Sequence, residues 1–149
     1  MLRISKKMFY AVDAVLYIAY NTKTDPISSK DIAARQGLPP RYLEQIMQKL
    51  VRAGILRGVR GPRGGYVLAK ERRRVSVAEI CDVIKEMDSL DVAALEQTNI
   101  GGKIVYPLCK ELEQSLQARL ESLTMSVLCE QASSLKIKSQ RDEHNDFTI

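Results

Sequence analysis

Residues 28–66 read SSKDIAARQGLPPRYLEQIMQKLVRAGILRGVRGPRGGY, and their pattern predicts the fold of the first half of the chain. Ser28 with Asp31 predicts the start of a helix, because the hydroxyl can accept a hydrogen bond from a free backbone N–H and the acid suits the positive helix end. Gly37 then ends this helix, since glycine adopts the left-handed conformation at little cost. The pair Pro39–Pro40 lacks N–H donors, so it fits at the opening of a second helix.

The second helix has two different faces. Its apolar residues recur at helical spacing and form one buried stripe: Leu43, Ile46, Met47, Leu50 and Val51. Its other side carries long hydrogen-bonding side chains: Arg41, Tyr42, Gln45, Gln48, Lys49 and Arg52. Two short helices joined by a tight glycine turn, the second one exposing such side chains, are typical of a helix-turn-helix that reads DNA.

A basic hairpin follows directly. Ile55 and Leu56 begin a short apolar strand, and residues 66–68 form a return strand. The tip between them alternates arginine with glycine and proline, including Arg57, Arg60, Gly61, Pro62 and Arg63. Arginine suits such a tip because it can enter a narrow minor groove or bind phosphate with two hydrogen bonds. A hairpin of this kind standing alone would be read as a solvated surface element, but after a helix-turn-helix we expect DNA contact.

The charge distribution favours the same function. Residues 35–74 hold eleven Lys or Arg and two acids, Glu44 and Glu71, which gives +9; the whole chain is +5, so the remainder is −4. A basic block beside an acidic remainder indicates phosphate binding. Within this block, residues 70–74 are equally well read as a solvated charge run beyond the wing.

The rest of the chain reads as mostly helical. A first helix is expected over 5–21, and Ser76 with Glu79 forms a capping box that opens a helix through Met87. We therefore predict a mainly α fold, in which a winged helix-turn-helix domain with a two-stranded wing (1–90) is followed by a linker or regulatory loop (91–106). A long dimerisation helix (107–131) and a flexible tail (132–149) complete the expected organisation.

The long helix, opened by Pro107, carries an apolar stripe that predicts a homodimer. Six residues, spaced by three or four positions, make up this stripe: Leu108, Leu112, Leu116, Leu120, Leu123 and Val127. Packing against the chain's own winged domain is the alternative, and it would need only part of the stripe. A two-fold dimer would place two recognition helices on successive major grooves and predicts an inverted-repeat operator.

Composition excludes several other classes. The sequence contains no run of eighteen apolar residues, so no membrane span is expected. Its three scattered cysteines fit a reducing cytosol better than a disulfide framework, so we expect a cytoplasmic protein. The lone histidine, His144, lies in the tail, and no phosphate loop or catalytic triad is present in the sequence, so an enzyme is not expected. A winged helix that binds protein or RNA instead of DNA is the remaining alternative, because this scaffold is reused.

The motifs resemble one family closely. The runs ARQGLPPRYLEQIMQKLVRAGIL, VRGPRGGYVLAK and VSVAEICDVI are similar to the Rrf-two family of bacterial winged-helix transcription regulators. This resemblance implies a homodimeric regulator, usually a repressor, with the second helix in the major groove and the wing in the minor groove. It suggests that Tyr42 and Gln45 make groove or phosphate contacts and that Arg60 enters the minor groove. Arg41 replaces a small hydroxyl residue and Arg63 replaces a frequent glycine, so sequence preference here is expected to differ.

Glu44 has two readings of equal weight. The resemblance implies that this position tunes base preference, since a carboxylate can accept a hydrogen bond from cytosine N4. The other reading is a helix-surface acid that pairs with Gln48 or Lys49.

The cysteines depart from the family pattern. Cluster-binding relatives carry three closely spaced cysteines before the long helix, whereas residues 88–107 here contain none. Cys81, Cys109 and Cys129 are scattered, so we expect no cofactor and no metal site, and in particular no conventional iron–sulfur cluster. The signal is left open between thiol chemistry at Cys109 or Cys129, whose alternative is an ordinary cysteine, and a protein or small-molecule effector acting on residues 88–106.

Overall fold

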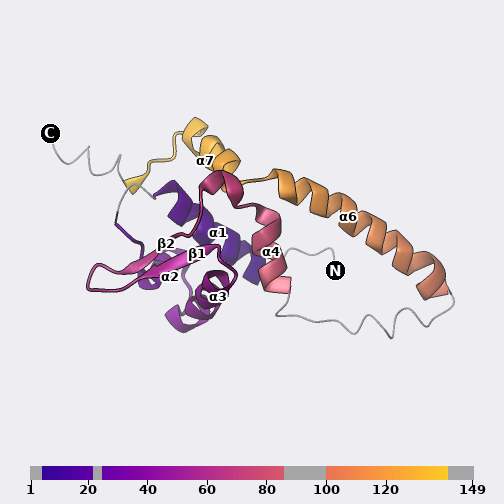
Figure 1. Ribbon diagram of the computed structural model, residues 1–149, viewed down its shortest axis with the longest axis horizontal. Coiled ribbons are helices and arrows are strands. Elements are labelled where there is room, and N and C mark those ends of the chain that lie inside the picture. Colours follow the sequence, from indigo (N-terminus) through magenta and orange to yellow (C-terminus); the bar gives the residue numbers. More distant parts are fainter. Residues whose placement is uncertain (1–4, 22–24, 86–99, 141–149) are drawn as a thin grey trace.

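The computed structural model describes residues 5–21, 25–85 and 100–140 (Figure 1). The first part contains α1 (Lys6–Tyr20), α2 (Ser29–Gln36), α3 (Pro40–Arg52), β1 (Leu56–Val59), β2 (Gly65–Leu68), the short helical turn η1 (Arg72–Arg74) and α4 (Val77–Lys85). The last part contains η2 (Gly101–Val105), α6 (Tyr106–Ser122) and α7 (Met125–Ser134). None of the helices in these ranges combines the length and hydrophobicity that a membrane crossing requires.

The helix-turn-helix forms as predicted. The N–H of Asp31 donates to the Ser28 hydroxyl over 3.1 Å and caps α2. Gly37 ends that helix at φ 67°, in the left-handed region that glycine adopts without strain. Pro40 then occupies the first turn of α3, where its missing N–H costs nothing.

The wing is an antiparallel hairpin in which Gly58 faces Tyr66. It is attached to the helix-turn-helix at its base: Ile27, which precedes α2, exchanges two backbone hydrogen bonds with Tyr66, at 3.1 and 2.8 Å. The close approach explains Gly65, because a Cβ there would lie 2.4 Å from the backbone C and O of Ile27. The wing therefore has a fixed position relative to α2.

The core lies between α1, the buried face of α3, and α4 with α7. α1 is the central helix of this arrangement, and Ala11, Ala14, Val15, Ile18 and Ala19 are buried along it. The predicted stripe of α3 is buried at Leu43, Ile46, Met47 and Leu50, while Val51 packs at the edge. Small residues on α1 let the neighbouring helices approach closely, which gives this short domain one continuous core.

The long C-terminal helix differs from the prediction. Instead of one helix over 107–131, the chain forms α6 and α7, separated by an extended Leu123 and Thr124. After the break, the N–H of Val127 donates to the Thr124 hydroxyl over 3.2 Å and caps the start of α7. The extended residues also bridge to the segment before α4, where Val77 N–H donates to Leu123 O and Met125 N–H donates to Val75 O, each at 2.8 Å.

The start of this helix also differs. Pro107 does not open it, since the chain is already helical from Ile100 and residues 101–105 form a wide π turn. In that turn the N–H of Tyr106 donates to Gly101 O. The wider turn accommodates a proline, which lacks an N–H and whose ring clashes with a regular preceding turn.

The predicted flexible tail is partly ordered. Residues 133–134 still belong to α7, and the N–H of Gln140 donates to the buried Asn21 side chain over 2.7 Å. The Gln140 amide also donates to the Tyr17 hydroxyl over 3.0 Å. Residues 135–140 therefore lie against the end of α1, while 141–149, with His144, fall outside the described residues.

Candidate nucleic-acid interface

The outer face of α3 presents the side chains that the sequence predicts. Arg41, Glu44, Gln45, Gln48 and Arg52 are exposed, and Lys49 is half-buried. The helix is held in place by its buried stripe, so these side chains project from a rigid element. Such a face offers both charge for phosphate and hydrogen-bonding groups for base edges.

Tyr42 is different from its neighbours on α3. It is half-buried, and its ring packs edge-on against Tyr10 of α1, with the centroids 6.5 Å apart and the planes at 89°. The ring therefore anchors the start of α3 to α1. Its predicted groove or phosphate contact remains a prediction, and that contact would use a side chain whose position is already set by packing.

The wing tip is exposed and tightly folded. Arg60, Gly61, Pro62 and Arg63 are all exposed. Gly61 has φ 119°, and a Cβ on Gly64 would lie 2.4 Å from the Val59 carbonyl oxygen. Glycine is thus required at both positions, and the arginines are carried on a compact turn instead of a loose loop.

The cations of α3 and the wing form no ion pair within the described residues. Ion pairs join Lys70 to Glu79, Arg73 to Glu71 and Lys85 to Asp82, and none within the described ranges involves the cations of α3, β1 or the wing tip. Arg35 of α2 is also occupied, because its guanidinium lies 3.9 Å from the centre of the Tyr17 ring. Six cations lie on the recognition helix and wing, and all of them except the half-buried Lys49 are exposed: Arg41, Lys49, Arg52, Arg57, Arg60 and Arg63.

The basic run 70–74 has local contacts. Besides the ion pairs of Lys70 and Arg73, the positive charge of Arg72 lies near Cys129 of α7 and partly offsets the burial that raises the pKa of that thiol. Two of the four positive charges in this run, those of Lys70 and Arg73, are therefore paired with acids inside the protein. We therefore expect residues 70–74 to add to the positive potential of this surface and not to make specific contacts with DNA.

Glu44 lies near the base of the wing. It forms no hydrogen bond or ion pair with Gln48 or Lys49 within the described structure, so that pairing is absent. Burial, and after it the negative charge of Glu44, raises the pKa of the Tyr66 hydroxyl. The carboxylate is therefore exposed next to the junction of recognition helix and wing.

The three cysteines lie on three different helices. Cys81 of α4 and Cys129 of α7 are buried, the latter 3% exposed, and Cys109 of α6 is half-buried. Burial raises the pKa of the Cys81 and Cys129 thiols, which disfavours the thiolate that metals and oxidants require. No cluster of three or more His, Cys, Asp or Glu suited to a metal ion occurs within 5–21, 25–85 and 100–140.

The predicted dimerisation stripe divides into two parts. Leu120 and Leu123 pack against the core, whereas Leu108, Leu112 and Leu116 are 52%, 46% and 40% exposed, and Val127 of α7 is exposed as well. Sequence reasoning missed Ile100 and Ile104, which are also exposed and extend the same spacing of four towards the N-terminus. The spacing of four is visible in the sequence, but Gly101 and Gly102, which lie between the two isoleucines, favour a loop.

Comparisons with known proteins agree with this geometry. Residues 4–131 match the model of the Rrf2 family, described as an iron-dependent transcriptional regulator. The regulator IscR of Klebsiella pneumoniae (strain 342) is 31% identical over 145 residues, which cover 96% of this chain and 89% of that protein.

Solved structures give the same result. The structure of T. potens IscR has a TM-score of 0.74 at 31% identity and covers 92% of this chain and 93% of that one. CymR of B. subtilis, a global cysteine regulator, has a TM-score of 0.70 at 28% identity, covering 87% and 98%. With its helix-turn-helix, wing and C-terminal helices in the same arrangement, the chain belongs to the Rrf2 family of winged helix-turn-helix, DNA-binding transcription regulators, and it is not an enzyme.

Proposed function

We propose that this regulator acts as a homodimer that binds an inverted-repeat operator and represses transcription from it. The observation that carries the proposal is the concentration of cations on α3 and the wing: six lie there, five are exposed, and none forms an ion pair within the described ranges. Unpaired cations on a rigid helix and a tight hairpin are available to neutralise phosphates and release counterions. The exposed amides of Gln45 and Gln48 add groups that can recognise adenine.

The dimer is supported by the exposed half of the α6 stripe. Leu108, Leu112 and Leu116 follow one another at single-turn intervals on a helix that extends away from the domain (Figure 1). A row of large apolar side chains in water is costly, and a second copy of the same helix would cover it symmetrically. A dimer bound across two half-sites blocks the same DNA for other proteins, which is the basis for proposing repression.

We also propose that the protein works without a conventional iron–sulfur cluster. The supporting observations are the positions of the three thiols on α4, α6 and α7 and the burial of two of them. Of the two signals that the sequence leaves open, an effector acting near residues 88–106 is favoured over thiol chemistry at Cys129, because that thiol is buried. Thiol chemistry at Cys109 is still an alternative, since this thiol is only half-buried on α6, the arm that extends away from the domain.

The deciding experiment is selection of bound fragments from the source genome by the purified protein under reducing conditions, followed by sequencing. Enrichment of an inverted repeat, whose binding weakens steeply with salt, is the expected result. An Arg60→Ala protein carried through the same selection is the matched control and should enrich the repeat less. Binding without an enriched motif would contradict operator recognition and would favour a module that binds RNA or protein.

A further inference from the structure

The wing is attached to the rest of the protein at both ends, and the two attachments differ. At its first end, β1 follows α3 directly, and the Ile55 N–H donates to Leu50 O over 3.0 Å. At its second end, the chain leaves β2 at Leu68 and must cross to α4. The Ala69 N–H still donates to Ile55 O over 3.0 Å, and the described chain next pairs with another strand-like segment at Ser76, which lies opposite Thr124.

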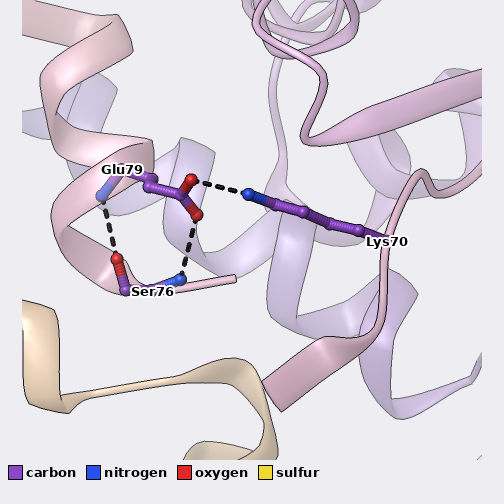
Figure 2. Close-up of polar contacts among 3 residues, drawn as sticks. All are labelled: Lys70, Ser76 and Glu79. Carbon is purple, nitrogen blue, oxygen red and sulfur yellow. Dashed lines mark hydrogen bonds and ion pairs between the residues drawn. The ribbon is translucent and has the colours of Figure 1, made fainter. Parts of the chain in front are cut away.

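One carboxylate joins this second end to α4. Glu79 closes the predicted capping box: the Glu79 N–H donates to the Ser76 hydroxyl over 3.2 Å, and the Ser76 N–H donates to Glu79 Oε2 over 3.4 Å. The other oxygen, Oε1, accepts a hydrogen bond from Lys70 Nζ over 2.6 Å. Figure 2 shows Lys70 reaching across from the segment after the wing to the carboxylate that the capping box holds in place.

The same segment is bound to the C-terminal helices. Val75 and Val77, on either side of Ser76, exchange backbone hydrogen bonds with Met125 and Leu123 at the junction of α6 and α7. The wing exit, the first turn of α4 and the base of the α6 arm therefore meet at one point. Lys70 and Glu79 are the side chains that connect the wing to this point.

We propose that Glu79 is a positioning residue for the wing: through Lys70 it fixes where the wing lies relative to α4 and the α6–α7 junction. This inference rests on the proposed function, in which the wing contacts DNA. The ordinary alternative is a surface ion pair without consequence, as expected for Glu71 and Arg73. The two pairs differ in their surroundings, since the Lys70 and Glu79 side chains are 33% and 41% exposed, against 73% and 63% for Arg73 and Glu71.

The test compares Glu79→Gln with Glu71→Gln on the DNA fragment that the genomic selection recovers. Both substitutions remove one negative charge near the wing, so electrostatics alone predicts that both bind DNA equally well or more tightly. If Glu79 positions the wing, Glu79→Gln instead weakens binding about two- to fivefold, the upper part of the range for ion pairs near a protein surface, and Glu71→Gln does not. Lys70→Arg, which keeps the pair, should retain wild-type affinity.

Two further readouts separate positioning from a loss of stability. In an Arg60→Ala background, where the wing contact is already gone, Glu79→Gln should have no further effect on affinity. Without DNA, hydrogen exchange of the Ala69 amide should be faster in Glu79→Gln than in Glu71→Gln. If Glu79→Gln fails to fold, the same comparison can be made between Lys70→Ala and Arg73→Ala, because each of these substitutions removes one positive charge.

Each outcome has one meaning. Equal affinities for Glu79→Gln and Glu71→Gln, with unchanged exchange at Ala69, would overturn the positioning role. If the wild-type protein enriches no fragment, the proposed operator function fails, and the exchange measurement then decides the positioning role by itself.

Discussion

Gly65→Ala tests whether the wing is fixed to the helix-turn-helix through Ile27. The new Cβ would lie 2.4 Å from the backbone C and O of Ile27 and 2.7 Å from the Ser28 nitrogen. These are backbone atoms, so the contact cannot be relieved by rotating a side chain. The strand must move away from Ile27, and both hydrogen bonds between Ile27 and Tyr66 are lost.

The expected cost follows from those two bonds. Each contributes about 1 kcal/mol net, and a buried group left without a partner costs about 1–3 kcal/mol, so the free energy of unfolding should fall by about 2–4 kcal/mol. With a denaturation slope of about 2 kcal/mol/M, the midpoint in urea should fall by about 1–2 M. The affinity for operator DNA should fall too, because the wing would no longer be held beside α2 and α3.

Gly58→Ala is the matched control. Gly58 lies in β1 opposite Tyr66, and a Cβ there meets no atom within 4 Å. Its free energy of unfolding should change by no more than about 0.5 kcal/mol. Urea midpoints that agree for the two variants would refute the close-approach reasoning and detach the wing from Ile27.

Three further predictions concern the interface, the arm and the thiols. Arg60→Ala should weaken specific DNA binding by about 1–3 kcal/mol. Arg73→Ala should leave specificity intact and lower the slope of log affinity against log salt concentration by at most about one unit. Equal and negligible effects of both substitutions in a DNA titration would show that the wing does not contribute to binding. Leu112→Glu should give a monomer in light scattering at micromolar concentration while Gln114→Glu, on an exposed position of the same helix, stays dimeric; a monomeric wild-type protein would contradict the dimer. Burial raises the pKa of the Cys81 and Cys129 thiols above their ordinary value of 9.0, so the unfolded chain loses these protons at lower pH than the folded protein does. The contribution of the two thiols to the free energy of unfolding is therefore complete below pH 9 and is lost as the pH rises through the pKa of the folded state. In the native protein iodoacetamide should therefore label Cys109 before Cys129, and oxidant-dependent DNA binding that disappears in Cys129→Ser would overturn this order of reactivity.

Local signals predicted the DNA-binding half of the fold well. Ser28, Gly37 and Pro40 each act within a few residues of their own position, through a cap, a left-handed turn and a missing N–H. The capping box at Ser76 and Glu79 is equally local, and it forms as expected. For such features the sequence contains both the group and its partner, so a prediction needs no knowledge of the remaining structure.

The break at Thr124 could not be predicted from periodicity. The leucine spacing continues through it, and the residues favour helix on both sides. What decides the break is a partner about fifty residues earlier, because Leu123 and Met125 bond the backbone of Val77 and Val75. The same long-range packing buries Cys129, whose environment is not visible from its neighbours in sequence.

One end of the α6 stripe is buried in the core and the other is exposed, and this arrangement links α6 to DNA recognition. Leu120 and Leu123 fix one end of α6 in the same core that buries Met47 and Leu50 of α3. The exposed residues, centred on Leu112, are therefore displayed at a set position relative to the recognition helix. If two copies join through that surface, the separation of their recognition helices is determined by α6 as a rigid spacer, and it must match the 34–36 Å between successive major-groove faces. An effector that shifts the base of α6 would act on this separation and, through Val75–Val77, on the wing at the same time.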